Sequence, residues 1–234
     1  MTALLSVEHL EVRFGAAPVV DDVSFEIAAG EKFALVGESG SGKSITALSV
    51  LGLVDGATTT GAIRFDGADL LQASERELRA VRGAEIAMIF QEPMTALNPL
   101  HTVGAQISEV LSLHFGLGTR EARERAVELL DKTGIPEPAR RVDAYPHQLS
   151  GGQRQRAMIA MALAGRPKLL IADEREFLAG GDLERDVVDD RYAGEADLEM
   201  LDREQRGHAR SGPVAIDAPS TSEVGFRRSP WAPA

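Results

Sequence analysis

The chain has 234 residues, no cysteine and a formal net charge of −11 at pH 7. This length suits one substantial domain or slightly more, and the lack of cysteine excludes disulfides, zinc–thiolate sites, iron–sulfur clusters and cysteine nucleophiles. The acidic balance argues against a nucleic-acid binder, which needs a basic surface. We find neither a run of about 18 apolar residues nor a basic leader, so we expect a cytoplasmic protein.

Five apolar runs in the first ninety residues, separated by glycine, aspartate and proline, predict strands. They span residues 4–14, 19–27, 32–36, 62–66 and 85–90. From residue 103 to 135 the apolar positions recur with a helical period, which predicts a small helical subdomain. Residues 168–172 form a short apolar run of the kind found in buried parallel strands.

The strongest motif, GESGSGKS at residues 37–44, lies between an apolar run and a potential helix. Its glycines let consecutive backbone N–H groups form an anion nest, and a following helix N-terminus adds partial positive charge. In such a loop the lysine neutralises phosphate oxygens and the serine hydroxyl binds Mg²⁺. The motif therefore predicts a nucleoside triphosphate site made by Gly37, Glu38, Ser39, Gly40, Ser41, Gly42, Lys43 and Ser44.

A second glycine motif distinguishes among the many proteins with phosphate loops. It is Leu149, Ser150, Gly151, Gly152 and Gln153, at the start of a predicted helix. Alone, such a sequence is more often an ordinary helix cap. Together with the phosphate loop it resembles the signature of the ATP-binding cassette (ABC) family, which binds the γ-phosphate of ATP held by the opposite subunit.

The resemblance implies roles for four further residues. Asp173 and Glu174 follow the apolar run 169–172, as in the Walker B strand of the family: Asp173 would hold the Mg²⁺ water shell and Glu174 would polarise the attacking water. Gln91 matches the Q-loop, which reaches metal and water, and Phe14 stands where an aromatic ring stacks on adenine. Alone, the three polar residues would fit about equally well as the solvated ends of strands, and a phenylalanine at the end of an amphipathic strand is more often part of the core.

The implied fold is α/β: a P-loop NTPase core with an antiparallel β subdomain and an inserted helical subdomain. We expect the ATP-binding domain at residues 1–174, with the helical subdomain at about 94–157. The sequence around the motifs resembles that of ATPase subunits of bacterial dipeptide, oligopeptide and nickel importers. This resemblance is found at residues 36–44, 90–99, 145–150 and 169–174. His101, His114 and His147 are scattered among apolar and loop positions, which argues against their forming a nickel site.

This resemblance implies the cofactors ATP and Mg²⁺ and a peripheral position on the cytoplasmic face of the cell membrane. Its partners would be a second ABC ATPase subunit, as homo- or heterodimer, and two integral-membrane permeases. An extracytoplasmic solute-binding protein would act indirectly, and no nucleic acid is expected.

After Glu174 the sequence departs from the family. Residues 175–182 replace the expected D-loop, and His208 lacks the strand context of the switch histidine. Residues 175–234 contain 12 Ile, Leu, Val, Phe or Met, too few for a core, so we expect a disordered tail. The abrupt change suggests a reading-frame shift near codon 174. The departure leaves open the alternative of an ATP-binding remnant without turnover. A second alternative is a soluble ABC ATPase of DNA repair or translation.

Overall fold

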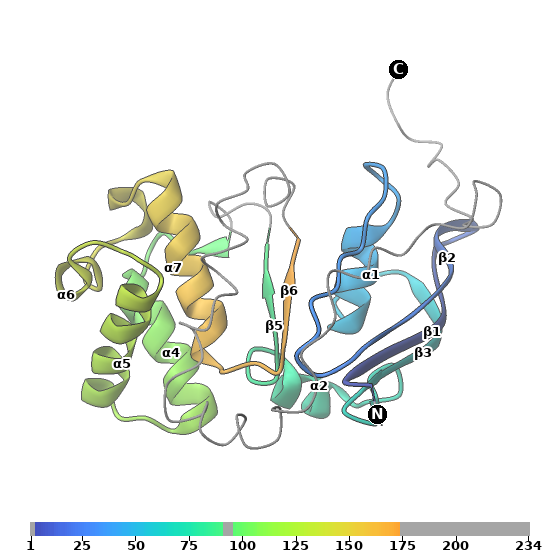
Figure 1. The fold of residues 1–234 in the computed structure, drawn as a ribbon, viewed down its shortest axis with the longest axis horizontal. Helices are drawn as coiled ribbons and strands as arrows, with labels where there is room; N and C mark the ends of the chain where they lie inside the picture. The colour runs from blue at the N-terminus through green and yellow to red at the C-terminus, as the bar shows by residue number, and fades with distance from the viewer. Residues whose placement is uncertain (1–2, 91–95, 174–234) are drawn as a thin grey trace, which may run out of the picture. The chain divides into compact units, whose positions relative to one another are not determined.

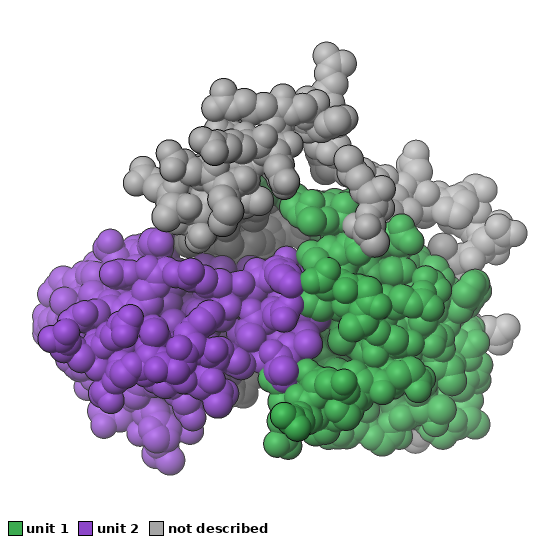
Figure 2. Space-filling model, turned by 90° about the horizontal axis from the view of Figure 1, so that it is seen from below, with its two compact units in different colours: residues 1–79, 210–234 green, residues 80–209 purple. Residues whose placement is uncertain are grey.

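The computed structural model describes residues 3–90 and 96–173. The described residues divide into two compact units, one within residues 1–79 and one that begins at residue 80 (Figure 2). The predicted site residues Gln91 and Glu174, and the whole segment 175–234, lie outside the described residues.

The first unit is built on an antiparallel sheet of four strands in the order β2-β1-β3-β4 (Figure 1). The strands are β1 (Leu5–Phe14), β2 (Ala17–Ile27), β3 (Thr58–Phe65) and β4 (Ala68–Asp69). Alternating apolar residues of β1, among them Val7 and Val12, are buried under the sheet together with Val20 and Ile63. The sheet thus has one apolar and one polar face, as amphipathic strands require.

A bulge at His9 interrupts the alternation of β1. The pairing with β2 shifts between Val7 and Leu10, and the pairing with β3 shifts between Glu8 and Glu11. His9 has a φ of 49°, and the facing Gly61 has a φ of +100°. A β-carbon on Gly61 would lie 2.6 Å from the Glu8 carbonyl oxygen, so only glycine fits beside the bulge.

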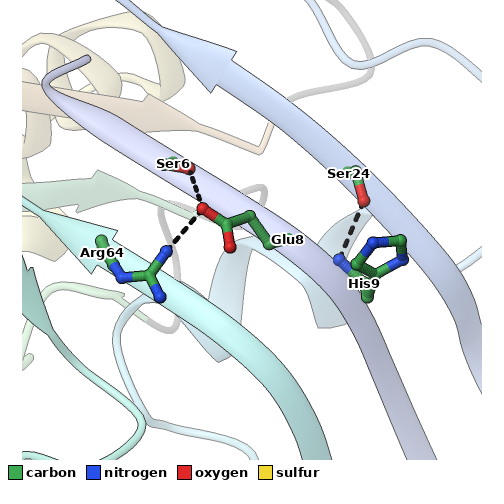
Figure 3. A network of polar contacts seen from close by, with 5 residues as sticks. All are labelled: Ser6, Glu8, His9, Ser24 and Arg64. Atoms are coloured by element: carbon green, nitrogen blue, oxygen red, sulfur yellow. Dashed lines mark hydrogen bonds and ion pairs between the residues drawn. The ribbon is translucent and has the colours of Figure 1, made fainter. Parts of the chain in front are cut away.

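The polar face of this sheet carries two ion pairs around the bulge. One of them, between Arg64 and Glu8, is drawn in Figure 3. Arg64 on β3 lies 2.5 Å from the carboxylate of Glu8, and the bond from Arg64 lowers the pKa of Glu8. His9 Nδ1 lies 2.6 Å from Asp22 Oδ1, and this hydrogen bond raises the pKa of His9. Both pairs are solvent-exposed, so salt weakens them.

The predicted strand at residues 32–36 is wrong. Residues 31–38 have no regular secondary structure, because no strand in the described part of the chain forms a ladder with them. The segment still has an inner and an outer side: Phe33 is half-buried and stacks on Phe25 with ring centroids 4.9 Å apart, whereas Val36 is 73% exposed. It leads into the loop before α1 (Lys43–Val50), and α2 (Glu75–Val81) follows β4.

The second unit combines a two-stranded parallel sheet with a helical bundle. The sheet pairs β5 (Ile86–Ile89) with β6 (Leu169–Ala172). The helices are α4 (Val103–Phe115), α5 (Thr119–Lys132), α6 (Pro138–Arg141) and α7 (Gly151–Ala164), with a 3-10 turn at Pro146–Gln148. The prediction of a helical subdomain after residue 103 is confirmed, and α4, α5 and α7 share one buried apolar core.

A close backbone contact returns the chain from α7 to the sheet. Gly165 lies against the backbone of Gly83, where any β-carbon would overlap the Gly83 carbonyl oxygen. Beyond this contact, the N–H of Leu169 bonds to the carbonyl of Glu85, and Lys168 lies 2.9 Å from the Glu85 carboxylate. None of the described helices is long and apolar enough to cross a membrane.

Candidate functional site

The loop at residues 37–42 ends in a glycine that no other residue can replace without cost. Gly42 is the N-cap of α1 and has a φ of 92°. A β-carbon there would lie 2.6 Å from the carbonyl oxygen of Val19 on β2. Gly42 therefore lets the start of α1 approach the sheet, and the side chain of Thr46 adds a hydrogen bond to the Gly42 carbonyl.

Lys43 occupies the centre of the loop. Its ammonium donates to the carbonyl oxygens of Gly37 and Glu38, each at 2.8 Å, and to the hydroxyl of Ser41 at 3.3 Å. The amide of Ser41 donates in turn to the Glu38 carbonyl. Residues 36–40 are exposed, so a compact, hydrogen-bonded loop with a central cation lies open to solvent. Such a loop offers backbone N–H groups and one positive charge to an anion.

Ser44 follows in the first turn of α1 and is exposed. Phe14 lies in the same unit, at the end of β1, where it pairs with Ala17 across the hairpin. The residue is 40% exposed, so it is available for stacking. Ala17 precedes Val19, the residue against which Gly42 packs, by two positions, or about 7 Å along the strand. The role of Phe14 in stacking stays a prediction.

The second glycine motif begins α7, as expected. Ser150 is the N-cap: its Oγ accepts from the amide of Gln153 at 3.3 Å, and the Gln153 side chain accepts from the amide of Ser150 at 3.1 Å. Leu149 is buried and anchors the turn. Gly151 and Gly152 are exposed, with no atom within 4 Å of where a β-carbon would be. Their backbone is therefore accessible to a ligand at the positive end of the helix dipole.

Asp173 follows β6 directly. Its amide donates to the carbonyl of Ile89 at 3.0 Å, which continues the parallel ladder by one residue. Because Ile89 pairs with Ala172, the two strands end at the same edge of the sheet. Asp173 is half-buried there, and Phe90, the last described residue before Gln91, also leaves the sheet at this edge. Carboxyl ends of parallel strands are where α/β proteins bind ligands.

The predicted site residues thus fall into two groups. Phe14 and residues 37–44 belong to the first unit, and residues 149–153 and Asp173 belong to the second. Within the described residues, no three His, Asp or Glu side chains lie close enough together to hold a metal ion. Ser44 and Asp173 nevertheless supply a hydroxyl and a carboxylate, the hard oxygen donors that suit Mg²⁺ when water and phosphate complete its shell.

Three supporting residues were missed by the sequence reasoning. Val19 bounds the space at Gly42, and Phe25 receives the ring of Phe33 before the loop. Gln148 caps the turn before Ser150, because its side chain accepts from the amide of Tyr145 at 2.8 Å. Only the last carried a local signal, a glutamine three residues after a possible cap.

A family model described as ABC transporter matches residues 20–175. The match includes the phosphate loop, the glycine motif at α7 and the end of β6. The chain belongs to the ABC transporter family.

Curated relatives in the ABC transporter family include proteins named for peptide transport. The chain is 61% identical over 178 residues to the peptidoglycan transport ATP-binding protein YejF of Agrobacterium fabrum, covering 73% of this chain and 33% of that protein. It is 54% identical to the dipeptide transport ATP-binding protein DppD of Escherichia coli K12, covering 74% of this chain and 54% of that protein. The chain therefore spans only a third to about half of the length of these relatives.

Solved cassettes confirm the fold. The dimeric structure of MJ0796, a bacterial ABC transporter cassette, matches with a TM-score of 0.68 and 27% identity over 86% of this chain and 83% of that one. A post-hydrolysis dimer of MJ0796 bound to ADP and phosphate matches with a TM-score of 0.64 and 29% identity, covering 72% of each chain. The predicted fold class, an ABC ATPase cassette with an antiparallel β subdomain and a helical subdomain, is thus confirmed.

Proposed function

We propose that this chain is the ATP-binding and ATP-hydrolysing subunit of a bacterial ABC importer for di- or oligopeptides, or for nickel. The observation that carries the proposal is the phosphate loop, closed around Lys43, in a chain that also begins α7 with a doubly bonded Ser150 cap. The names of the curated relatives support peptides as the transported class.

On triphosphate binding, a phosphate oxygen would replace one of the present hydrogen-bond acceptors of the Lys43 ammonium. Its ammonium has three protons, and all three have acceptors in the loop. The bond to Ser41 Oγ, at 3.3 Å, is the longest, so we expect it to be the one replaced by a phosphate oxygen. The carbonyls of Gly37 and Glu38 would keep the ammonium in place, while loop amides bind the remaining phosphate oxygens.

Adenine binding would use Phe14, whose exposed ring lies at the tip of the β1–β2 hairpin. Ser44, Asp173 and Gln91 would hold Mg²⁺, partly through water, and the ion would supply charge neutralisation at the phosphates. Glu174 would orient and deprotonate the attacking water. Ser150 Oγ and the amides of Gly151 and Gly152 would bind the γ-phosphate held by a second ATPase subunit.

This scheme makes ATP the link between two ATPase subunits, homologous or identical. Hydrolysis removes the γ-phosphate contact and releases the pair. Two integral-membrane permeases would convert this cycle into transport, with solute delivered by an extracytoplasmic binding protein. The chain would then work at the cytoplasmic face of the cell membrane.

A binding and turnover assay on the full chain tests the proposal. Lys43→Ala should weaken ATP affinity at least tenfold, because it removes the cation from the loop, whereas Lys32→Ala, at an exposed site before it, should not. Glu174→Gln should abolish phosphate release but preserve an ATP-dependent dimer. Equal ATP affinity in the Lys43 variant would refute the assignment of this loop.

A second reading, the ATP-binding remnant, is favoured by the departure from the family after residue 174. It predicts ATP binding that depends on Lys43, but neither phosphate release nor an ATP-dependent dimer. Resequencing codons 165–234 and translating all three frames shows whether the departure comes from a frame shift or belongs to the genuine protein. A D-loop and a switch histidine in another frame would identify residues 175–234 as the product of a frame shift.

A further inference from the structure

We propose that an aromatic stack between Phe25 and Phe33 fixes the entry to the phosphate loop, so that both phenylalanines are positioning residues for nucleotide binding. Phe25 lies on β2, and Phe33 lies in the segment that leads into the loop. The two ring centroids are 4.9 Å apart, and the ring planes differ by 16°. This role rests on the proposed function, because the loop concerned is the one assigned to ATP.

The segment before the loop is held by side chains. In the described part of the chain, residues 31–38 belong to no strand ladder. A side-chain contact can then do what ladder hydrogen bonds do for an ordinary strand. Half-buried side chains alternate with exposed ones along the segment: Phe33 and Leu35 are half-buried, and Lys32, Ala34 and Val36 are exposed.

A tight turn brings Phe33 back to β2. The amide of Glu31 donates to the carbonyl of Ala28 at 3.2 Å, and the Glu31 carboxylate accepts from the Ala28 amide at 2.7 Å. Gly30, between them, has a φ of 75°, which glycine adopts without strain. The chain thus reverses within four residues, and this reversal lets Phe33 stack on Phe25, eight positions before it.

Both ends of the phosphate loop are thereby anchored on one strand. At the exit of the loop, Gly42 packs against the carbonyl of Val19, which also lies on β2. Val19 and Phe25 are six residues apart, or about 20 Å along a strand. Between these anchors, the Lys43 ammonium bonds only to carbonyl and hydroxyl oxygens within residues 37–41. Those bonds shape the loop, whereas the two anchors place it on the sheet.

Loss of the entry anchor would weaken nucleotide binding without removing any group that touches the nucleotide. An anion nest binds when its N–H groups converge on one point. The apparent dissociation constant therefore rises in inverse proportion to the fraction of molecules whose loop has that arrangement. A stacked aromatic pair shifts such an equilibrium by about two- to tenfold. We expect ATP affinity to fall by this factor when the stack is removed.

The test is isothermal titration calorimetry of the full chain with ATP and Mg²⁺. Phe33→Leu keeps an apolar side chain but removes the ring, so it should weaken ATP binding about two- to tenfold. Phe33→Tyr keeps the ring and should bind ATP as the wild type does. Phe25→Leu should weaken binding as Phe33→Leu does, and the double variant should lose no more than either single variant, because both remove the same contact.

Phe65→Leu separates positioning from general stability. Phe65 is buried on β3 in the same unit, so the same chemical change there should lower the unfolding temperature. It should leave ATP affinity unchanged, because Phe65 lies outside the path that leads to the loop. Wild-type affinity in Phe33→Leu would overturn the inference, as would an equal loss of affinity in Phe65→Leu.

A second measurement needs no ATP. The amide of Ser41 donates to the carbonyl of Glu38 at 3.1 Å, and its hydrogen exchange reports local opening of the loop. This amide should exchange faster in Phe33→Leu than in the wild type or in Phe65→Leu. If the wild type binds no ATP, the proposed function fails, and the exchange rates still show whether the stack fixes the loop. Equal exchange in all three proteins would refute the anchor itself.

Discussion

Gly42 and Val19 meet so closely that a β-carbon on Gly42 would lie 2.6 Å from the Val19 carbonyl oxygen. This contact joins the start of α1 to β2 and so sets where the phosphate loop ends. The close approach of Gly42 to the Val19 carbonyl oxygen therefore helps to position the next two residues, Lys43 and Ser44.

Gly42→Ala should destabilise the first unit and weaken ATP binding. The positive φ alone costs about 1–2 kcal/mol, and the overlap with Val19 adds to it. Gly40→Ala is the matched control: Gly40 also has a positive φ, of +80°, but no atom lies within 4 Å of its β-carbon position. Thermal unfolding should rank wild type above Gly40→Ala and Gly40→Ala above Gly42→Ala; equal loss in both variants would show that only φ matters.

Ser150→Ala should destabilise the second unit by about 1 kcal/mol, because the amide of Gln153 loses its acceptor. Ser150→Thr keeps a hydroxyl at the cap and should restore most of that stability. Chemical denaturation of both variants measures the difference. If Ser150→Ala unfolds at the same denaturant concentration as the wild type, the cap contributes nothing to the free energy of unfolding.

Gly165→Ala should disrupt the return from α7 to β6. The backbone of Gly83 occupies the space, and a backbone atom cannot rotate away as a side chain can. We expect a loss of several kcal/mol, at the upper end for single substitutions. Gly118→Ala, in open space before α5 with an ordinary φ of −69°, should be close to neutral. Unfolding curves that coincide for the two variants would contradict the contact.

The His9–Asp22 pair should make stability depend on pH. The hydrogen bond that His9 Nδ1 donates to the Asp22 carboxylate raises the pKa of His9, so the pair stabilises the folded state fully below the unfolded pKa of about 6.5. This contribution is lost as the pH rises through the folded pKa. His9→Asn and Asp22→Asn, which both tolerate positive φ, should therefore lower the unfolding midpoint at pH 5.5 more than at pH 8.5.

High salt should reduce the difference between the effects of these variants at pH 5.5 and at pH 8.5, since the side chains of His9 and Asp22 are both exposed. A constant difference at all pH values would show that the variants act through the backbone bulge instead.

Local rules predicted the start of α7 and the helical period after residue 103, but not the short helices α2 and α6. The start of α7 at Ser150 depends on hydrogen bonds within four residues, so the sequence pattern contains all the information. The phosphate loop is similar, because its glycines and Lys43 interact mainly with one another.

Non-local contacts were beyond the sequence reasoning. The run 32–36 has strand composition, but a strand needs a neighbouring ladder, and composition does not show whether one exists. The contact between Gly83 and Gly165 joins positions 82 residues apart, with no periodic pattern to reveal it. The three threonines at 58–60, by contrast, carried a β-branched signal that would have extended the strand predicted at 62–66.

In the described part of the chain, β6 has β5 on one side and no strand on the other. Such an edge is a template for pairing between molecules, and Ala172 on it is exposed. The edge is only four residues long, and the net charge of −11 makes copies repel each other. Storage conditions should therefore matter: dilute buffer preserves this repulsion between molecules, whereas concentrated salt screens it and favours turbidity.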